Sequence, residues 1–467
     1  MRNKIIIGVV LLILCALSVH SEHPRDMQFP PLEFSPVMPV RMELDNGLTV
    51  YFLEDHQLPV VIASALIHGG SAYDPPEKSG LAAITAALLR SGGAGSRTPN
   101  EVDEALDFVG IRINSRASSE EINLNMNALK KDMALAFEVF ADMLMNPLFD
   151  SGKAALEISN QKDEIRRQND EPGLVTRRVY YSTVYAGHPY GVYPTLASMD
   201  SIKLDDIKAN HKEFYNPHNC VLAISGDMTR QEADSVLEKY FSGWQKSGQV
   251  PQNPPTATAN YKPGVYYAEK DMNQAHIRFG HLCMDNKNPD RHAMDVMNFV
   301  LGGGGFVSRM LNQVRTSAGL AYSVGTYCYN RPYMGTFFAY CQTRSDAMGQ
   351  ALKMMMDIIT EVKNNGITQE EMELAKESII NNFVFNYDTP DKIVYAAAYN
   401  EFYGFPADQQ ERDLRAYQAV TLEDCNRVAR EYLHTDNIAI VITGNKELFD
   451  QPLNTFGDVT AVSMEVE

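Results

Sequence analysis

Basic residues are scarce in this 467-residue sequence: 41 Lys and Arg stand against 59 Asp and Glu, so the formal net charge is −18. Proteins that bind nucleic acid neutralise its phosphates with a face rich in Lys and Arg, so this balance argues against a nucleic-acid partner. An anionic membrane surface is disfavoured for the same reason. The apolar content of 45%, with 23 Tyr and 20 Phe, excludes a disordered chain. The length predicts two to four domains at roughly 100–200 residues each.

Cysteine is also scarce, with six in the whole chain. One of them, Cys15, lies in the N-terminal run described below, and the other five are Cys220, Cys283, Cys328, Cys341 and Cys425. None stands in a C-x-x-C arrangement, which argues against a structural zinc site and a thioredoxin-like redox motif. Most lie in apolar, strand-like runs, which is typical of buried, unreactive thiols. A Cys328–Cys341 disulfide within one predicted hairpin stays open.

Long apolar runs are absent apart from one at the N-terminus. Arg2 and Lys4 precede a 15-residue apolar run over residues 5–19, and small-residue cleavage geometry follows at residues 19–21. This pattern predicts a cleavable signal peptide over residues 1–21 and export to the periplasm or cell envelope. An uncleaved anchor is disfavoured because a spanning helix needs about 20 residues. A lipoprotein signal at Cys15 is disfavoured because a leucine precedes it. No later segment predicts stable membrane insertion.

The sequence repeats itself at an offset of 218 residues. Residues 202–214 align without gaps on residues 420–432, and the register continues until Gly226 meets Gly444. Each copy has the pattern of an amphipathic helix followed by a buried apolar strand and a glycine turn. We therefore predict two homologous domains that arose by duplication.

A compositional boundary separates the two copies. Residues 246–264 hold four prolines among Gln, Asn, Thr, Ser and Gly, and they lack periodicity, which is typical of a linker. This places an N-terminal domain at 38–245 and a C-terminal domain at 265–450.

Each half shows the same mixture of strands and helices. In the first half, strand patterns at 41–67 and 111–129 alternate with helical patterns at 98–109 and 130–145. In the second half, strand patterns at 265–283 and 321–343 alternate with helical patterns at 291–301 and 346–364. The order predicts an α+β fold in which each domain is a mainly antiparallel sheet with helices packed on one face.

Residues 69–93, from Gly69-Gly-Ser-Ala-Tyr to Ser-Gly-Gly93, resemble the core motif of the pitrilysin/insulinase zinc metallopeptidases. In active members of that family, the helix that follows the position of Gly80 carries H-x-x-E-H. The two histidines bind zinc from one helix face, the glutamate polarises the attacking water, and a second glutamate downstream completes the ligand set. The resemblance extends over residues 40–445. It implies a two-domain chain that forms half of a clamshell.

The zinc-binding chemistry of the family is missing from this chain. The two histidine positions fall at Ala83 and Ala87, and the glutamate position falls at Ala86. The downstream ligand position falls at Glu164, and the 76 residues between positions 87 and 164 match the family spacing. One carboxylate cannot hold a catalytic zinc that needs three protein ligands. We therefore expect no metal in this chain and interpret Glu164 as an ordinary helix residue near Arg166 and Arg167.

The C-terminal signature of the family is retained. Residues 298–324 contain four glycines at 302–305, followed by Arg315 and Tyr322 seven residues apart. The resemblance implies that this pair binds the substrate backbone and stabilises the tetrahedral intermediate near zinc. A guanidinium and a phenol are suitable preorganised donors for an oxyanion. The alternative is that Arg315 caps or ion-pairs at a helix end and that Tyr322 is an ordinary strand aromatic.

Family members of this size often work in pairs, in which the zinc helix of one subunit faces the Arg/Tyr strand of the other. This chain therefore resembles the non-catalytic half of an exported peptidase, inactive alone and active only with a homologous partner that carries H-x-x-E-H and the zinc. Its substrates would be peptides or small proteins, held beside the strand at 111–118 by β-augmentation.

Two alternatives remain open at this point. The chain can be a peptide-binding or scaffolding protein with no hydrolytic role, or an enzyme with unrecognised ligands. The acidic balance of the whole chain favours cationic peptides through long-range steering.

Overall fold

The structure is a computed structural model, and it describes residues 37–246 and 251–464. The predicted signal peptide, residues 1–21, lies outside the described residues. Residues from Pro36 onward form one compact unit that contains two six-stranded sheets with helices, so the fold is α+β as predicted. No helix in the described part is long and apolar enough to cross a bilayer.

The first sheet has the strand order β1-β2-β6-β3-β5-β4, and only the β2–β6 pair is parallel. Its strands are β1 (Val40–Glu43), β2 (Thr49–Glu54), β3 (Val60–His68), β4 (Arg112–Ala117), β5 (Glu121–Leu129) and β6 (Cys220–Gly226). The helices of this half are α2 (Leu81–Ser91), α3 (Pro99–Val109), α4 (Met133–Met145), α5 (Ser151–Arg167), α6 (Pro172–Val184), α7 (Leu196–Ser201), α8 (Leu204–Phe214) and α9 (Arg230–Phe241).

The second sheet has the order β12-β7-β11-β8-β10-β9, in which the first two pairs are parallel and the others antiparallel. Its strands are β7 (Gly264–Glu269), β8 (Gln274–Leu282), β9 (Ala321–Tyr329), β10 (Thr336–Arg344), β11 (Ala439–Gly444) and β12 (Val459–Ala461). The helices are α10 (Arg291–Asn298), α11 (Met348–Asn365), α12 (Gln369–Phe383), α13 (Pro390–Tyr403), α14 (Gln409–Ala419) and α15 (Leu422–Tyr432).

The two copies of the sequence repeat occupy equivalent places. In the first copy, α8 leads into β6, which pairs parallel with β2 and antiparallel with β3. In the second copy, α15 leads into β11, which pairs parallel with β7 and antiparallel with β8. Both strands are buried along their whole length, which explains their continuous apolar sequence. The two domains are therefore structurally homologous.

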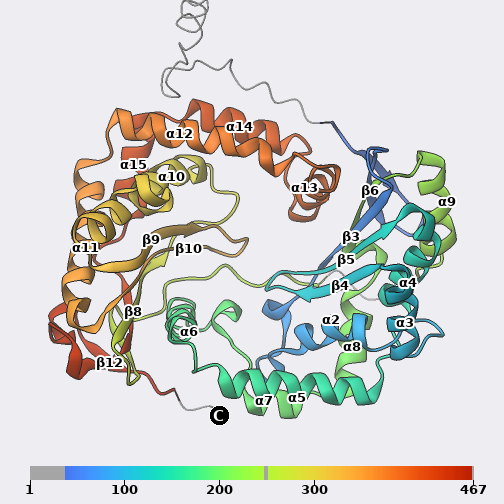
Figure 1. The fold of residues 1–467 in the computed structure, drawn as a ribbon, viewed down its shortest axis with the longest axis horizontal. Coiled ribbons are helices and arrows are strands. Elements are labelled where there is room, and N and C mark those ends of the chain that lie inside the picture. The colour runs from blue at the N-terminus through green and yellow to red at the C-terminus, as the bar shows by residue number, and fades with distance from the viewer. Residues whose placement is uncertain (1–36, 247–250, 465–467) are drawn as a thin grey trace, which may run out of the picture. The chain divides into compact units, whose positions relative to one another are not determined.

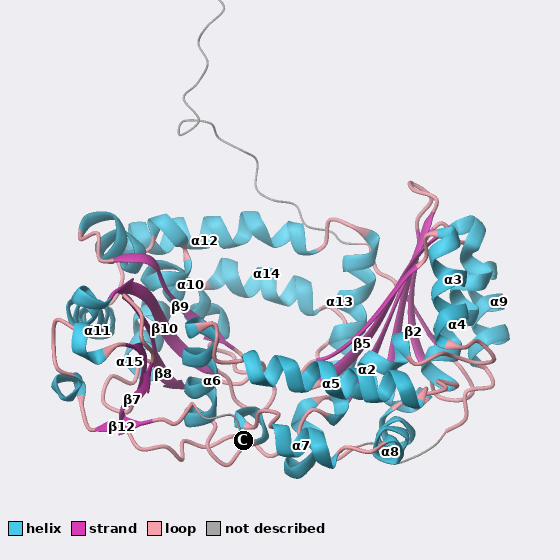
Figure 2. Ribbon diagram, turned by 60° about the horizontal axis from the view of Figure 1, so that its bottom comes forward, coloured by secondary structure: helices cyan, strands magenta, loops and turns pink. Residues whose placement is uncertain are grey.

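The helices of each half pack on one face of its own sheet, and each half also lends a helix to the other. Figures 1 and 2 show α3, α4 and α9 along one face of the first sheet, while α13 of the second half lies on the opposite face. There, Phe402 of α13 stacks on His68 of β3 with ring centroids 3.7 Å apart. In return, α6 of the first half packs on β11 and β8, where Tyr180 is completely buried. The repeat pattern does not predict this exchange.

The cysteine closest to Cys328 is Cys283, not Cys341. Cys341 pairs with Val324, four residues along β9 from Cys328, so the two cannot meet across the hairpin. The Sγ atoms of Cys283 and Cys328 lie 3.7 Å apart, and all five described cysteines are free thiols.

We expect oxidised glutathione to join Cys283 and Cys328 by thiol–disulfide exchange, with release of two molecules of reduced glutathione. Peptide mapping by mass spectrometry should find this pair linked, and Cys328→Ser should abolish the link while Cys341→Ser leaves it intact. A bridge between Cys328 and Cys341 would contradict the observed strand register.

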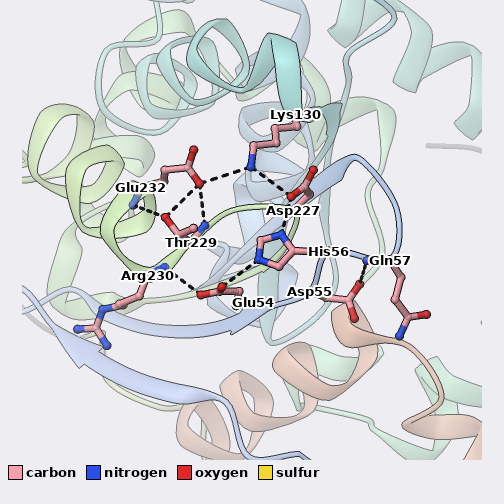
Figure 3. Close-up of polar contacts among 9 residues, drawn as sticks. All are labelled: Glu54, Asp55, His56, Gln57, Lys130, Asp227, Thr229, Arg230 and Glu232. Atoms are coloured by element: carbon pink, nitrogen blue, oxygen red, sulfur yellow. Dashed lines mark hydrogen bonds and ion pairs between the residues drawn. The ribbon is translucent and has the colours of Figure 1, made fainter.

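An exposed network of charged side chains ties the end of the first sheet to the start of α9 (Figure 3). His56 Nδ1 lies 2.6 Å from Asp227 Oδ1, and His56 Nε2 lies 2.9 Å from Glu54 Oε1. Lys130 donates to the same Asp227 oxygen at 3.2 Å. The carboxylates of Asp227 and Glu54 raise the pKa of His56 above its ordinary value.

This shift gives His56 a stabilising contribution with a definite pH dependence. Because folding raises the pKa, the contribution is complete below the unfolded value of 6.5 and is lost as pH rises through the folded value. When the pH is raised from about 6 to about 8, the His56→Asn variant should therefore lose less stability than the unsubstituted chain. Urea unfolding midpoints at the two pH values measure this difference, with Gln57→Asn as the control. An equal loss in both chains would show that folding leaves the His56 pKa unchanged.

Candidate functional site

The helix that aligns with the zinc helix of the family is intact. It is α2, and it begins after Gly80, whose φ of 102° favours glycine. Upstream, Asp74 accepts hydrogen bonds from the backbone N–H groups of Gly80 and Ala82, both at 2.9 Å, and so caps the helix start. Burial outweighs these hydrogen bonds and raises the pKa of Asp74 to about 7. The frame of the motif therefore persists as structure.

The three positions that carry the zinc chemistry in active relatives present only methyl groups. Ala86 is completely buried, while Ala83 and Ala87, one turn apart, are half-buried. Glu164 is exposed on α5, and the ion pair of its neighbour Arg166 is formed with Asp163. Within residues 37–246 and 251–464, no group of three His, Cys, Asp or Glu side chains could hold a metal ion. A catalytic zinc does not fit this chain.

Arg315 and Tyr322 are brought together by the second half of the chain. Arg315 lies in the short helical turn Leu311–Ser317, where its neighbour Val314 is completely buried and fixes the turn to the core. Tyr322 lies at the start of β9 and is 77% exposed. The guanidinium carbon of Arg315 is 5.2 Å from the centroid of the Tyr322 ring and 5.2 Å from that of Phe306.

This geometry leaves the donors of the pair available for a ligand. In the described part of the chain, Arg315 forms no ion pair, and its guanidinium contacts the rings of Phe306 and Tyr322. Two aromatic faces hold the guanidinium by cation–π contacts, which leave its N–H groups unused. The arrangement offers a guanidinium and a phenol side by side, which suits an oxyanion or a peptide carbonyl.

Phe306 is a part of this cluster that the sequence pattern did not single out. It is 69% exposed and follows the turn of four glycines. The glycines are required there, because a Cβ on Gly302 would lie 2.5 Å from Thr326 Oγ1 of β9. A large apolar residue directly after such a glycine run is the signal that could have identified it.

Each sheet has an edge strand of interest: β4 ends the first sheet, and β9, which carries Tyr322, ends the second. On β4, Ile113 is buried in the core, while Arg112, Asn114 and Arg116 are exposed on the other face. An unpaired edge can accept an extended peptide as an additional strand. The predicted β-augmentation strand at 111–118 therefore coincides with a real edge.

A pair of pockets lies beside α13. One, of about 560 Å³, is lined by Asn330, Tyr399 and residues of α10 and α14. The other, of about 400 Å³, is lined by Arg112, Asn114 and other polar residues of β4 and β5. Both include Lys392 and Tyr395 of α13, so they are neighbours on one polar, tyrosine-rich surface.

Two family models match the chain. The model described as insulinase (peptidase family M16) matches residues 49–193, and the model described as peptidase M16 inactive domain matches residues 201–379. Among curated proteins, the uncharacterized zinc protease YmxG of Bacillus subtilis is 24% identical over 409 residues, which is 86% of this chain and 97% of that protein. An uncharacterized zinc protease of Rickettsia felis is 25% identical over 358 residues, which is 76% of this chain and 84% of that protein.

Three solved structures share the fold. A peptidase M16 inactive domain from Pseudomonas fluorescens has a TM-score of 0.82 at 24% identity, covering 89% of this chain and 100% of that chain. A protease from Helicobacter pylori has a TM-score of 0.77 at 20% identity, covering 88% and 100%. The periplasmic protease PqqL from Escherichia coli has a TM-score of 0.75 at 13% identity, covering 93% of this chain and 50% of that chain.

Proposed function

Because the chain belongs to the pitrilysin/insulinase-type (M16) peptidase family, we propose that it is the non-catalytic subunit of an exported zinc peptidase with two different subunits. A homologous partner supplies the H-x-x-E-H helix and its zinc. This chain supplies Arg315 and Tyr322, which bind the peptide substrate and the transition state in the partner's active site. The export of the chain rests on the signal-peptide pattern of residues 1–21.

The observation that carries the proposal is the contrast between the two halves. In the first half, the metal-binding positions are Ala83, Ala86 and Ala87 on an intact helix. In the second half, Arg315 and Tyr322 remain adjacent. Arg315 is half-buried, Tyr322 is exposed, and Arg315 has no ion-pair partner in the described residues. Two polar donors held side by side, on a helical turn and an edge strand, are suited to binding a peptide.

The residues of this chain act by binding and orientation. A peptide carbonyl that develops negative charge can accept hydrogen bonds from the Arg315 guanidinium and the Tyr322 hydroxyl. The free edges of β4 and β9 can hold the peptide backbone extended beside them. The proton transfers of hydrolysis belong to the partner, because the zinc-motif positions of this chain carry no acid or base.

Reconstitution tests the proposal. The mature chain, its partner and an equimolar mixture are each assayed with an internally quenched peptide library. We expect hydrolysis by the mixture only. A chain that hydrolyses peptides alone would contradict the assignment. A mixture without activity would favour the other candidate, a peptide-binding or scaffolding protein.

A further inference from the structure

The side chain of Arg278, on β8, is a largely desolvated cation, and it forms no ion pair with the carboxylates that the structure describes. It lies on the face of the second sheet that α6 covers, between the ring of Phe338 at 4.2 Å and the ring of Tyr181 at 5.7 Å. In the described part of the chain, no Asp or Glu oxygen lies within 4.0 Å of it. Other enclosed arginines have polar partners: Arg309 pairs with Glu371, Arg331 pairs with Glu120, and Arg178 donates to the side-chain oxygen of Asn169.

Burying such a cation costs free energy. A charged group removed from water needs an opposite charge or hydrogen bonds to offset the lost hydration. Burial lowers the pKa of Arg278, and the neighbouring Arg177 acts in the same direction because it carries the same charge. Tyr181 and Tyr180 oppose this effect on the pKa, and Tyr181 does so in part through a hydrogen bond. Within residues 37–246 and 251–464, no carboxylate offsets this cost.

The surroundings of Arg278 are suited to a ligand that comes from solvent. Tyr340 lies opposite Arg278 on β10 and stacks on Tyr327 of β9, with ring centroids 5.8 Å apart. Tyr327 and Tyr329 are more than half exposed. Tyrosine rings combine a flat apolar contact surface with a hydroxyl donor, which is a composition typical of binding surfaces.

We propose that Arg278, with Arg177 beside it, binds a carboxylate of the peptide that Arg315 and Tyr322 contact, so that this subunit selects acidic peptides. The inference rests on the proposed function. Gly325, which lies three residues after Tyr322, is two strands away from Arg278 across β10. At a rise of about 3.3 Å per residue and a strand spacing of about 4.8 Å, the two sites are roughly 14 Å apart. A peptide of about four extended residues spans that distance.

The first sheet supports the same choice of ligand. Arg112 and Arg116 are exposed on β4, and neither forms an ion pair with a carboxylate of the described residues. Asn114 lies between them on β4. Arg112 and Asn114 line the pocket of about 400 Å³, in which Asp391 is the acidic residue. The acidic balance of the whole chain, which alone would favour cationic peptides, acts at long range. Contact with the peptide is made by these arginines.

Peptide selection by the full mature chain tests this inference. The chain is immobilised and exposed to an equimolar random decapeptide mixture, and the bound peptides are sequenced by mass spectrometry. We expect enrichment of Asp and Glu, and we expect its loss in Arg278→Gln. Arg430→Gln removes an exposed arginine of α15 and should keep the enrichment. For one selected peptide, Glu→Gln should weaken binding about tenfold in the unsubstituted chain. In Arg278→Gln, the two peptides should bind alike.

The outcomes separate this inference from the proposed function. Arg278→Met keeps the apolar packing and removes the charge, and a normal circular dichroism spectrum would show that losses do not reflect misfolding. Enrichment of Lys, Arg or neutral residues would overturn the inference, as would acidic selection that survives Arg278→Gln. If Arg278→Gln instead abolishes association with the partner, the carboxylate belongs to the partner and the inference is wrong. If no peptide is retained, the inference also fails, while the proposed function is still decided by hydrolysis in the mixed pair.

Discussion

Substitution of Arg315 by alanine should lower peptide hydrolysis by the mixed pair roughly 10²–10³-fold, which is the usual effect of removing one oxyanion donor. The loss should appear mainly in kcat, because the guanidinium binds the charge that develops in the transition state more strongly than the neutral carbonyl. Arg315 forms no ion pair in the described structure, and its neighbour Tyr322 is 77% exposed. The substitution should therefore leave folding and subunit association intact.

Graded variants of the same pair make this prediction sharper. Arg315→Lys retains the charge but loses the planar fork, so it should recover only part of the activity. Tyr322→Phe keeps the ring that contacts Arg315 and removes only the hydroxyl donor. Arg430→Ala, at an exposed site on α15, is the matched control and should have full activity. Unchanged hydrolysis in Arg315→Ala would exclude a role for this residue in the active site.

Arg331→Met should destabilise the folded chain by about 3–5 kcal/mol, because it leaves Glu120 buried without its counter-ion. Arg331 lies in the turn between β9 and β10, and Glu120 lies in the turn between β4 and β5. The two are 8% and 9% exposed, and Arg331 Nη2 is 2.8 Å from Glu120 Oε1. The guanidinium carbon also lies 3.3 Å from the centroid of the Tyr190 ring. This ion pair therefore joins the hairpins of the two halves.

Urea unfolding followed by the fluorescence of Trp244, the single tryptophan, measures this loss. Trp244 is 5% exposed and belongs to the core of the first half, so it reports on the half that contains Glu120. The double variant Arg331→Met/Glu120→Leu replaces both charges by apolar groups and should recover much of the loss. Arg344→Met removes an arginine whose ion pair with Asp346 is exposed, and should cost less than about 1 kcal/mol. A loss that small in Arg331→Met would show that the buried pair is not important for stability.

Local elements could be predicted from the sequence because their signals are short. The Thr98 and Glu101 capping box opens α3, and the Thr368 and Glu371 capping box opens α12. Alternating residues over 111–129 predicted strand, and the structure divides this stretch into β4 and β5 with a turn between them. The repeated αβ unit predicted two equivalent domains. The structure differs from the helix predicted at 291–301. There, α10 ends at Asn298, and a wider helical turn continues to Gly303, among the glycines that pack on β9.

The family resemblance identified Arg315, Tyr322 and the three alanines of the candidate site, because the chain has the same motif spacing as the family. It did not supply Phe306, Arg278 or the Arg331–Glu120 pair. These depend on contacts between residues far apart in sequence, and periodicity within one element carries no information about them. The same holds for α6 and α13. Their apolar faces have the pattern of any amphipathic helix, but they pack on the sheet of the opposite half.

Composition also did not predict the contacts made by the stretch at 246–264. Its composition predicts a linker, and residues 251–263 contain no helix or strand. Nevertheless, Pro255 accepts a hydrogen bond from the ring of His188 at 2.7 Å, and the backbone N–H of Ala257 donates to Tyr333 at 3.0 Å. These contacts hold the segment against both halves.

The measurement that tests the half-enzyme assignment most directly is purification of the tagged mature chain from the cells that make it. Whatever co-elutes in equal amount is then identified, and zinc is counted per complex. We predict a partner of similar size that carries H-x-x-E-H, with one zinc per pair of subunits. A zinc-free chain that elutes without such a partner would contradict the account.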